Sequence, residues 1–331
     1  MEGATGIDVS MLKGKKLLNM DSEEEGVMLA SCAGGCRADV KLPVERETVS
    51  GTKLTVSLSG LTGGHSGSEI DKGRGNANIL MSRLLRDASA PVAIASIDGG
   101  RKDNAIPREC TAQIIVAPDE TAAVKASIEQ AAAEIAEEFK ASDPDLKLTV
   151  SEETDCSESA ISAKDSARVI ALIEALPNGI IRMSREIDKL VETSLNLGVL
   201  KSDDAAVTLR YAVRSSVGVA KKSLKNQLVC IAGAFAAEVT FEGDYPAWEY
   251  KKDSKLREDM VRIFEEMYGK KPTVEAIHAG VECGLLSGKI EGLDCISMGP
   301  DMYDIHTTEE RLSISSAKRS YEYILRVIAC K

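Results

Sequence analysis

The apolar residues of the chain fall into short runs, alternating stretches and helix-spaced stripes. The runs Lys16–Met20 and Val27–Cys32 predict buried strands, the first followed directly by Asp21. From about Arg37 the pattern changes, and apolar residues alternate with polar ones over 54–58, which is typical of a half-buried strand. Further strands are expected at Val92–Ile97, Ala112–Val116, Leu146–Val150, Ser194–Leu200, Ala206–Ser215, Glu238–Glu242, Thr273–Ile277 and Asp294–Met298. Helices are expected at Asn76–Arg86, Thr121–Lys140, Ser166–Leu176, Lys221–Ala237, Lys255–Tyr268 and Arg311–Ala329, with another starting at Glu282–Leu286.

This order of elements predicts an α/β domain interrupted by a large inserted domain. The inserted part, about 37–245, has antiparallel strands and segregated helices and is expected to be α+β. The stretch Asp244–Trp248, with Pro246 and the single Trp, marks the return to the first domain. The expected segments are therefore 1–36, 37–245 and 246–331. The two helix-and-strand sets of the insert have similar composition, but no sequence repeat shows a duplication.

Charge and composition exclude several classes of partner. Lys and Arg sum to 41 against 52 Asp and Glu, which gives a formal net charge of −11. This acidic balance argues against a nucleic acid or an anionic membrane surface as partner. No apolar run approaches ~18 residues, and the first ten residues have no signal-peptide pattern. The eight cysteines are therefore expected to be reduced thiols in the cytoplasm. The pair Cys32 and Cys36 has too few neighbouring ligands to favour a structural zinc.

Candidate chemistry centres on three histidines. A lone histidine is more often structural than functional, but His65 lies in a Gly-Gly-His-Ser-Gly turn, and His278 and His306 both follow predicted strands. Asp21 also follows a strand directly, and a carboxylate with an imidazole is a workable pair for zinc. The acidic residues Glu23–Glu25 are interpreted as a solvated turn.

Seven motifs follow one another along the chain: LLNMDSEEEG, CAGG, GLTGGHSGSEIDKGRGNAN, GGRKDNAIP, VRSS, HAGVECGL and GPDMYDIHTTEER. Their order resembles that in the aminoacyl-histidine dipeptidases, over essentially the whole chain. This family belongs to a metallopeptidase group that includes peptidase T and carnosinase. The resemblance implies a zinc-exopeptidase-like catalytic domain with two zinc ions, interrupted by a lid domain, and cytoplasmic hydrolysis of Xaa-His and related dipeptides.

The resemblance also implies roles for individual residues. Asp21 would be a ligand of one zinc and His306 of the other. The lid histidine His65 would help to hold the scissile carbonyl. His278 is interpreted as a structural residue, or as one that positions the residues of the site without contacting metal or substrate itself.

The resemblance assigns the substrate's terminal carboxylate to three further positions. Asn104 and Arg214 would bind it directly, and the backbone at Gly280 would face it. These residue types suit the task, because an arginine grips a carboxylate with two hydrogen bonds and asparagine adds a directed donor. Paired zinc ions would activate a water, and a glutamate would carry its proton to the leaving amine. A homodimer is left open, as is whether His65 serves its own or a partner subunit's site.

The sequence departs from the family pattern upstream of Asp21. Family members carry there a His-x-Asp motif, a metal-bridging aspartate and a Glu-Glu pair that supplies the general base. No histidine precedes His65, and only Glu2 represents glutamate before Asp21. The family's proline two residues after His306 is replaced by Thr308. We therefore expect an incomplete catalytic domain that lacks its N-terminal part, with an open sheet edge and an uncovered apolar face.

Two zinc ligands are fewer than zinc sites normally use. This chain alone is therefore expected to bind zinc weakly and to leave dipeptides uncleaved. The alternatives are a non-catalytic binding or dimerisation fragment that uses the lid, or the C-terminal half of a split enzyme.

Overall fold

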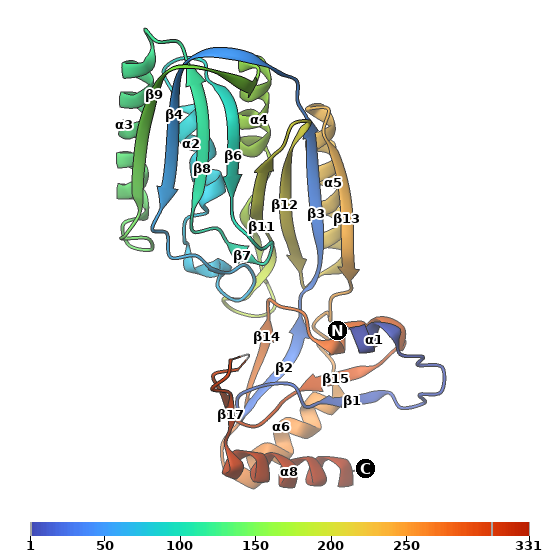
Figure 1. The fold of residues 1–331 in the computed structure, drawn as a ribbon. Coiled ribbons are helices and arrows are strands. Elements are labelled where there is room, and N and C mark those ends of the chain that lie inside the picture. The colour runs from blue at the N-terminus through green and yellow to red at the C-terminus, as the bar shows by residue number, and fades with distance from the viewer. Residues whose placement is uncertain (1, 306, 331) are drawn as a thin grey trace.

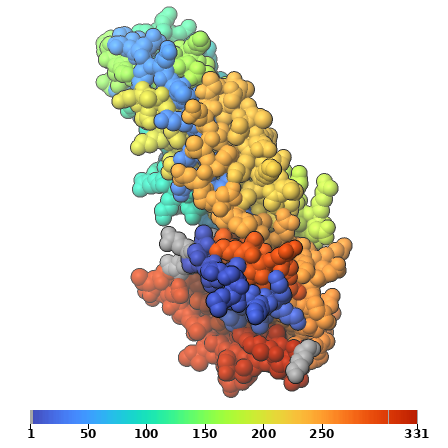
Figure 2. Space-filling model, turned by 90° about the vertical axis from the view of Figure 1, so that its right-hand side faces the viewer, coloured from blue at the N-terminus to red at the C-terminus, as the bar shows by residue number. Residues whose placement is uncertain are grey.

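The computed structural model describes residues 2–305 and 307–330, which form two units stacked end to end (Figure 1). The larger unit comprises residues 34–245, and the smaller unit comprises 2–33 and 246–330. In the space-filling view the two units form an elongated body, with the first and last parts of the chain together at one end (Figure 2). The α/β class and the insertion of an α+β unit are as the sequence predicted.

A nine-stranded sheet organises the larger unit. Its strand order is β13-β3-β12-β11-β6-β8-β4-β9, with β10 paired to β11. The strands are β3 (Gly34–Pro43), β4 (Arg46–Ser59), β6 (Ala93–Gly99), β8 (Cys110–Val116), β9 (Lys147–Ile161), β10 (Gly179–Met183), β11 (Val191–Ser202), β12 (Ala206–Ser215) and β13 (Glu238–Tyr245). The helices are α2 (Ala77–Arg86), α3 (Thr121–Phe139), α4 (Ala163–Ala175) and α5 (Gly218–Ala234), which lie behind the sheet in Figure 1.

The core of this unit lies between the sheet and its helices. Leu54, Val56 and Leu58 of β4 are buried in it, as their alternation predicts. The edge strand β9 is much longer than the expected 146–150 strand. Its additional residues are mostly polar and exposed and pair with β4 through the backbone, so no pattern of apolar residues predicts this part of the strand.

The smaller unit holds a four-stranded sheet of order β1-β15-β2-β14. Helices α6 and α8 pack on one face, around Met28, Met260 and Tyr323, and α7 packs on the other. The elements are α1 (Glu2–Gly6), β1 (Lys16–Asn19), β2 (Val27–Cys32), α6 (Lys255–Tyr268), β14 (Thr273–Ile277), α7 (Glu282–Lys289), β15 (Asp294–Ser297), β16 (Met302–Tyr303), β17 (Arg311–Leu312) and α8 (Ile314–Ala329). None of the helices within 2–305 and 307–330 has the length and apolar character needed to cross a membrane.

Several expectations for the smaller unit need correction. The strand at Lys16–Asn19 is a half-exposed edge strand rather than a buried one. Helices lie on both faces of the sheet, so neither face is left wholly uncovered. Exposed apolar side chains lie on α8, among them Ile328 at 68% exposure, and in the chain before the edge strand β1, among them Met11 at 85%. The interpretation of Glu23–Glu25 as a solvated turn was wrong for Glu25, whose carboxylate is paired with the Arg319 guanidinium through two hydrogen bonds. This ion pair lowers the pKa of Glu25.

Two segments of chain cross between the units, and they run side by side. Cys32 and Trp248 exchange backbone hydrogen bonds of 3.0 and 3.1 Å across the two crossings. A Cβ atom at Gly34 would lie 2.4 Å from the Ala247 nitrogen, so this close approach requires glycine. Because β3 begins at Gly34, the larger sheet starts before the expected boundary at Arg37.

Candidate functional site

The turn that carries His65 lies against the loop that carries Asn104. His65 belongs to the two-residue strand β5 (Gly64–His65), which pairs with β7 (Ala105–Ile106). The next amide along, that of Ser66, donates a hydrogen bond of 2.9 Å to the Asn104 carbonyl oxygen. Two motifs about forty residues apart are thereby fixed side by side, with the Asn104 side chain exposed beside the histidine turn.

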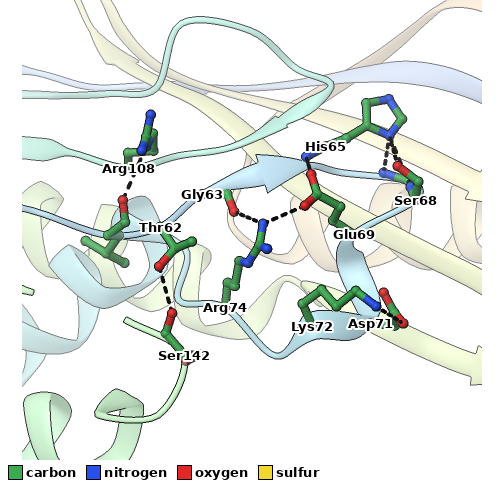
Figure 3. A network of polar contacts seen from close by, with 12 residues as sticks. Thr62, Gly63, His65, Ser68, Glu69, Asp71, Lys72, Arg74, Arg108 and Ser142 are labelled. Atoms are coloured by element: carbon green, nitrogen blue, oxygen red, sulfur yellow. Dashed lines mark hydrogen bonds and ion pairs between the residues drawn. The ribbon is translucent and has the colours of Figure 1, made fainter. Parts of the chain in front are cut away.

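The hydrogen bonds around His65 select one tautomer of its ring (Figure 3). The Ser68 amide, at 3.1 Å, and the Gly67 amide, at 3.3 Å, donate to Nδ1. A nitrogen that accepts cannot carry the proton of a neutral imidazole, so that proton is on Nε2. Burial, and secondarily the positive charge of Arg214, lower the pKa of His65. His65 is therefore a neutral Nε2–H donor at pH 7.

Glu69 holds the same turn in place. One of its carboxylate oxygens accepts the His65 amide at 2.8 Å, and the other accepts from the Arg74 guanidinium at 2.9 Å. Arg74 also donates to the Gly63 carbonyl at 2.5 Å, so the pair ties both ends of the turn together (Figure 3). Sequence reasoning did not single out Glu69, although it lies four residues after His65 in the quoted motif.

Arg214 is a buried cation without an anion. It lies at the end of β12, opposite Ser194 in β11 and Gly35 in β3, and is only 9% exposed. Among residues 2–305 and 307–330 its one hydrogen bond is a long one, 3.5 Å to the Tyr245 hydroxyl, and its Nε has no partner. Within the described part of the chain no carboxylate forms an ion pair with it. A buried, unpaired guanidinium is costly, and its chemistry suits a carboxylate ligand supplied from outside.

His278 brings the smaller unit up to this cation. The side chain is 5% exposed, and its Nε2 lies 2.7 Å from the Ser194 hydroxyl oxygen. Burial is the main reason that its pKa falls to about 3, with the charge of Arg214 adding to the effect, so the ring is neutral at pH 7. The sequence left His278 as a supporting residue, and it has no exposed face to offer a substrate.

Gly67 is the point where these groups meet. A Cβ atom built on it would lie 2.4 Å from the His278 carbonyl oxygen, 3.0 Å from the His65 ring and 3.1 Å from Arg214 Nε. His65, Arg214 and His278, which come from three distant parts of the sequence, are thus assembled within a single chain. Only glycine fits at the centre of the group.

The loops that carry Asn104 and Gly280 border the same place. Gly280 follows His278 by two residues and precedes Val281, the first flanking residue of α7. The Asn104 loop is fastened by the buried Asn196, whose amide donates to the carbonyls of Asp103, at 3.1 Å, and Ala105, at 2.9 Å. Sequence reasoning missed Asn196, because nothing in its local pattern distinguishes it from other strand residues.

Asp21, one of the two predicted metal ligands, is not part of this assembly. Asp21 follows β1 in the smaller unit and is exposed. The prediction for His306 falls outside the described residues. Over residues 2–305 and 307–330, no three His, Cys, Asp or Glu side chains are grouped so that they could hold a metal ion. The described residues therefore bring His65, Arg214 and the backbone of the Asn104 loop together, but they do not assemble a zinc site.

Known proteins share this fold and much of this sequence. The family described as "Peptidase dimerisation domain" matches residues 56–143. The chain is 34% identical over 320 residues to the cytosol non-specific dipeptidase of Escherichia coli (strain K12), a match that covers 96% of this chain and 66% of that protein. The crystal structure of the aminoacylhistidine dipeptidase of Vibrio alginolyticus superposes with a TM-score of 0.91 at 32% identity, covering 99% of this chain and 68% of that one. The chain thus spans about two thirds of the length of these relatives.

Proposed function

The chain belongs to the aminoacylhistidine dipeptidase family, and we propose on that premise that its Arg214 site binds the terminal carboxylate of a dipeptide for hydrolysis. One observation supports this most directly. Arg214 is only 9% exposed, and its guanidinium has no carboxylate partner in the described part of the chain. A carboxylate that enters there would satisfy the free Nε and remove the cost of an uncompensated buried charge. The dipeptidase names of both relatives agree with this chemistry.

Each neighbouring group has a proposed task in the same step. The Asn104 amide would donate to the substrate carboxylate, and the backbone at Gly280 would face it. The Nε2–H of His65 would donate to the scissile carbonyl oxygen, where negative charge develops as water adds. All four groups come from one chain, so we propose that His65 serves its own subunit's site.

Zinc is proposed from the family resemblance, with Asp21 and His306 each contributing one ligand to a different ion. When bound, zinc would activate the attacking water. The described residues do not fit such a site by themselves, because they place no third ligand near Asp21. We propose that these 331 residues alone bind zinc weakly and do not turn dipeptides over.

Calorimetric titration of the full chain with an Xaa-His dipeptide and with its C-terminal amide tests the proposed site. The free acid is expected to bind at least tenfold more tightly, because a hydrogen bond to a charged group contributes about 1.5–3 kcal/mol. Equal affinities for acid and amide would contradict a carboxylate site at Arg214. Zinc content and release of free histidine, measured on the same preparation, test the proposal about metal and turnover.

A role in subunit association is a second candidate, favoured by the match of residues 56–143 to a peptidase dimerisation domain. These residues run from the last part of β4 through α2 and α3 in the larger unit. We propose a homodimer formed through this unit, in the cytoplasm. Light scattering after size exclusion should give about twice the 35.4 kDa mass of one chain, and a monomer at micromolar concentration would contradict it.

A further inference from the structure

We propose that Ser194 and His278 form a latch that holds the two units closed over the Arg214 site. Their hydrogen bond of 2.7 Å is buried and joins β11 of the larger unit to the segment after β14 of the smaller one. Figure 1 shows β14 ending at the underside of the larger unit. Both residues are positioning residues, and neither needs to touch the substrate. The proposal deepens the dipeptide site proposed above and in that respect rests on it.

A latch is needed because the covalent connection alone does not fix the angle between the units. The two crossing segments are hydrogen-bonded to each other at Cys32 and Trp248 and so act as a single hinge. Among the described residues, Ser194 and His278 supply a hydrogen bond between side chains of the two units. Near the hinge itself, the Gly218 amide donates to the Glu249 carboxylate at 2.8 Å. His278 is also near the hinge, because the Ala33 amide donates to the carbonyl of Ile277, the residue before it. Its bond to Ser194 is buried, however, whereas the Gly218–Glu249 bond is exposed to water.

The sheet register connects the latch to the binding site. Ser194 lies directly opposite Arg214 on the neighbouring strand, so their side chains share one face of the sheet. When Ser194 holds the His278 ring, the loop that continues to Gly280 is held beside the guanidinium. The His278 carbonyl also packs on Gly67, which leaves room for no side chain. The latch therefore places the Gly280 backbone, the His65 turn and Arg214 around one space.

The chemistry of the pair suits a permanent contact. Both partners are neutral at pH 7 and buried, so they form an ordinary hydrogen bond that salt does not screen. The charged or titratable groups that face His278 are Arg214, whose positive charge disfavours a second one there, and His65, which is neutral at pH 7. His278 Nδ1 has no hydrogen-bond partner among the described residues, so loss of the serine hydroxyl would leave the second buried nitrogen of the ring without a partner, which favours opening.

Electron–electron distance measurements between the units of the full chain test the latch. One spin label is placed on Cys230, exposed on α5, and the other on Glu258→Cys, exposed on α6. The two remaining accessible thiols, Cys156 and Cys330, are replaced by serine in every sample. This arrangement reads the separation of the units with or without any activity.

Four variants are compared in that labelled background. Ser194→Ala and His278→Ala should broaden the distance distribution, with the closed population reduced about fivefold to tenfold relative to open forms. His278→Gln should restore much of the closed population, because its amide reaches the position of Nε2. Ser82→Ala is the matched control, since Ser82 is fully buried and bonds only within the larger unit, to the Ile170 carbonyl.

The outcomes separate the latch from the proposed function. A broadened distribution in Ser194→Ala and His278→Ala, with Ser82→Ala unchanged, supports the latch. A distribution in Ser194→Ala identical to that of Ser82→Ala overturns it. If the latch variants open while no protein, unmutated included, binds an Xaa-His dipeptide, the latch stands and the dipeptide proposal alone fails. If dipeptide binds, its affinity should fall in Ser194→Ala by the factor that the closed population loses.

Discussion

Replacing Arg214 with methionine should stabilise the fold and abolish carboxylate binding at the same time. The guanidinium is 9% exposed, has one long hydrogen bond and leaves Nε without a partner. An unsatisfied buried donor costs about 1–3 kcal/mol, and more when it is charged. Methionine is shorter than arginine but replaces its apolar stem and has no polar atom to satisfy, so the free energy of unfolding should rise by roughly 1–3 kcal/mol.

The loss of binding free energy should be larger than this gain in stability and opposite in sense. Two charge-assisted hydrogen bonds to a carboxylate contribute on the order of 3–6 kcal/mol, so affinity for a free-acid dipeptide should fall at least a hundredfold. Affinity for the C-terminal amide should change little, because the amide never gained those bonds. Urea unfolding followed by circular dichroism, together with calorimetric titration, measures both quantities.

Arg210→Met is the matched control for this prediction. Arg210 lies four residues away on the same strand, but it is satisfied by two hydrogen bonds to the Asp39 carboxylate, at 2.8 and 2.7 Å. Its half-exposed ion pair contributes about 0–1 kcal/mol, so its loss should destabilise slightly and leave dipeptide binding intact. If Arg214→Met destabilised the protein as much as Arg210→Met or more, the guanidinium would be satisfied in the free protein and the argument for an anion site would fail.

Two further changes probe the parts that support this site. The pKa of His278 falls from 6.5 in the unfolded chain to about 3 in the folded protein, so the unfolded state binds more protons between these pH values. When the pH is lowered from 6.5 to 5, the free energy of unfolding of the unmutated protein should therefore fall by up to ~1.4 kcal/mol per pH unit more than that of His278→Gln. Unfolding measured at each pH tests this. Identical pH dependence in the two proteins would show that the imidazole is not desolvated. Asn196→Ala should lower stability by about 2–3 kcal/mol through two unbonded carbonyls, at Asp103 and Ala105, and hydrogen exchange should quicken in the loop between them. Unchanged exchange there would assign the loop's order to other contacts.

The fold was predictable from sequence wherever apolar residues mark a buried face. Residues 206–215 and 255–268 form a strand and a helix with the bounds that their patterns gave, because both bury regularly spaced side chains. The strand β9 was predicted only at its start, since its polar remainder is held by backbone pairing with β4. The short strand β5 has two residues and no pattern at all.

The site shows the same limit in another form. The turn around His65 was predicted from its glycines, and the family resemblance singled out Arg214 and Asn104. Their meeting around Gly67, and the pairing of Ser194 with His278, depend on sheet register and on the angle between the units. Local sequence spacing predicts neither the register nor this angle, so roles could be assigned to Asn196, Ser194 and Glu69 only from the structure.

The two adjacent crossings at Gly34 and Ala247 make the larger unit a cassette. Its entry and exit strands, β3 and β13, are neighbours in one sheet, and Tyr245 pairs with Gly35 at the very place where the chain leaves. The apolar core of the nine-stranded sheet is drawn entirely from residues between these ends. Residues 34–245 therefore have the architecture of an inserted domain: their core is their own, and their two ends lie next to each other, so the unit can be inserted into a single loop of another domain.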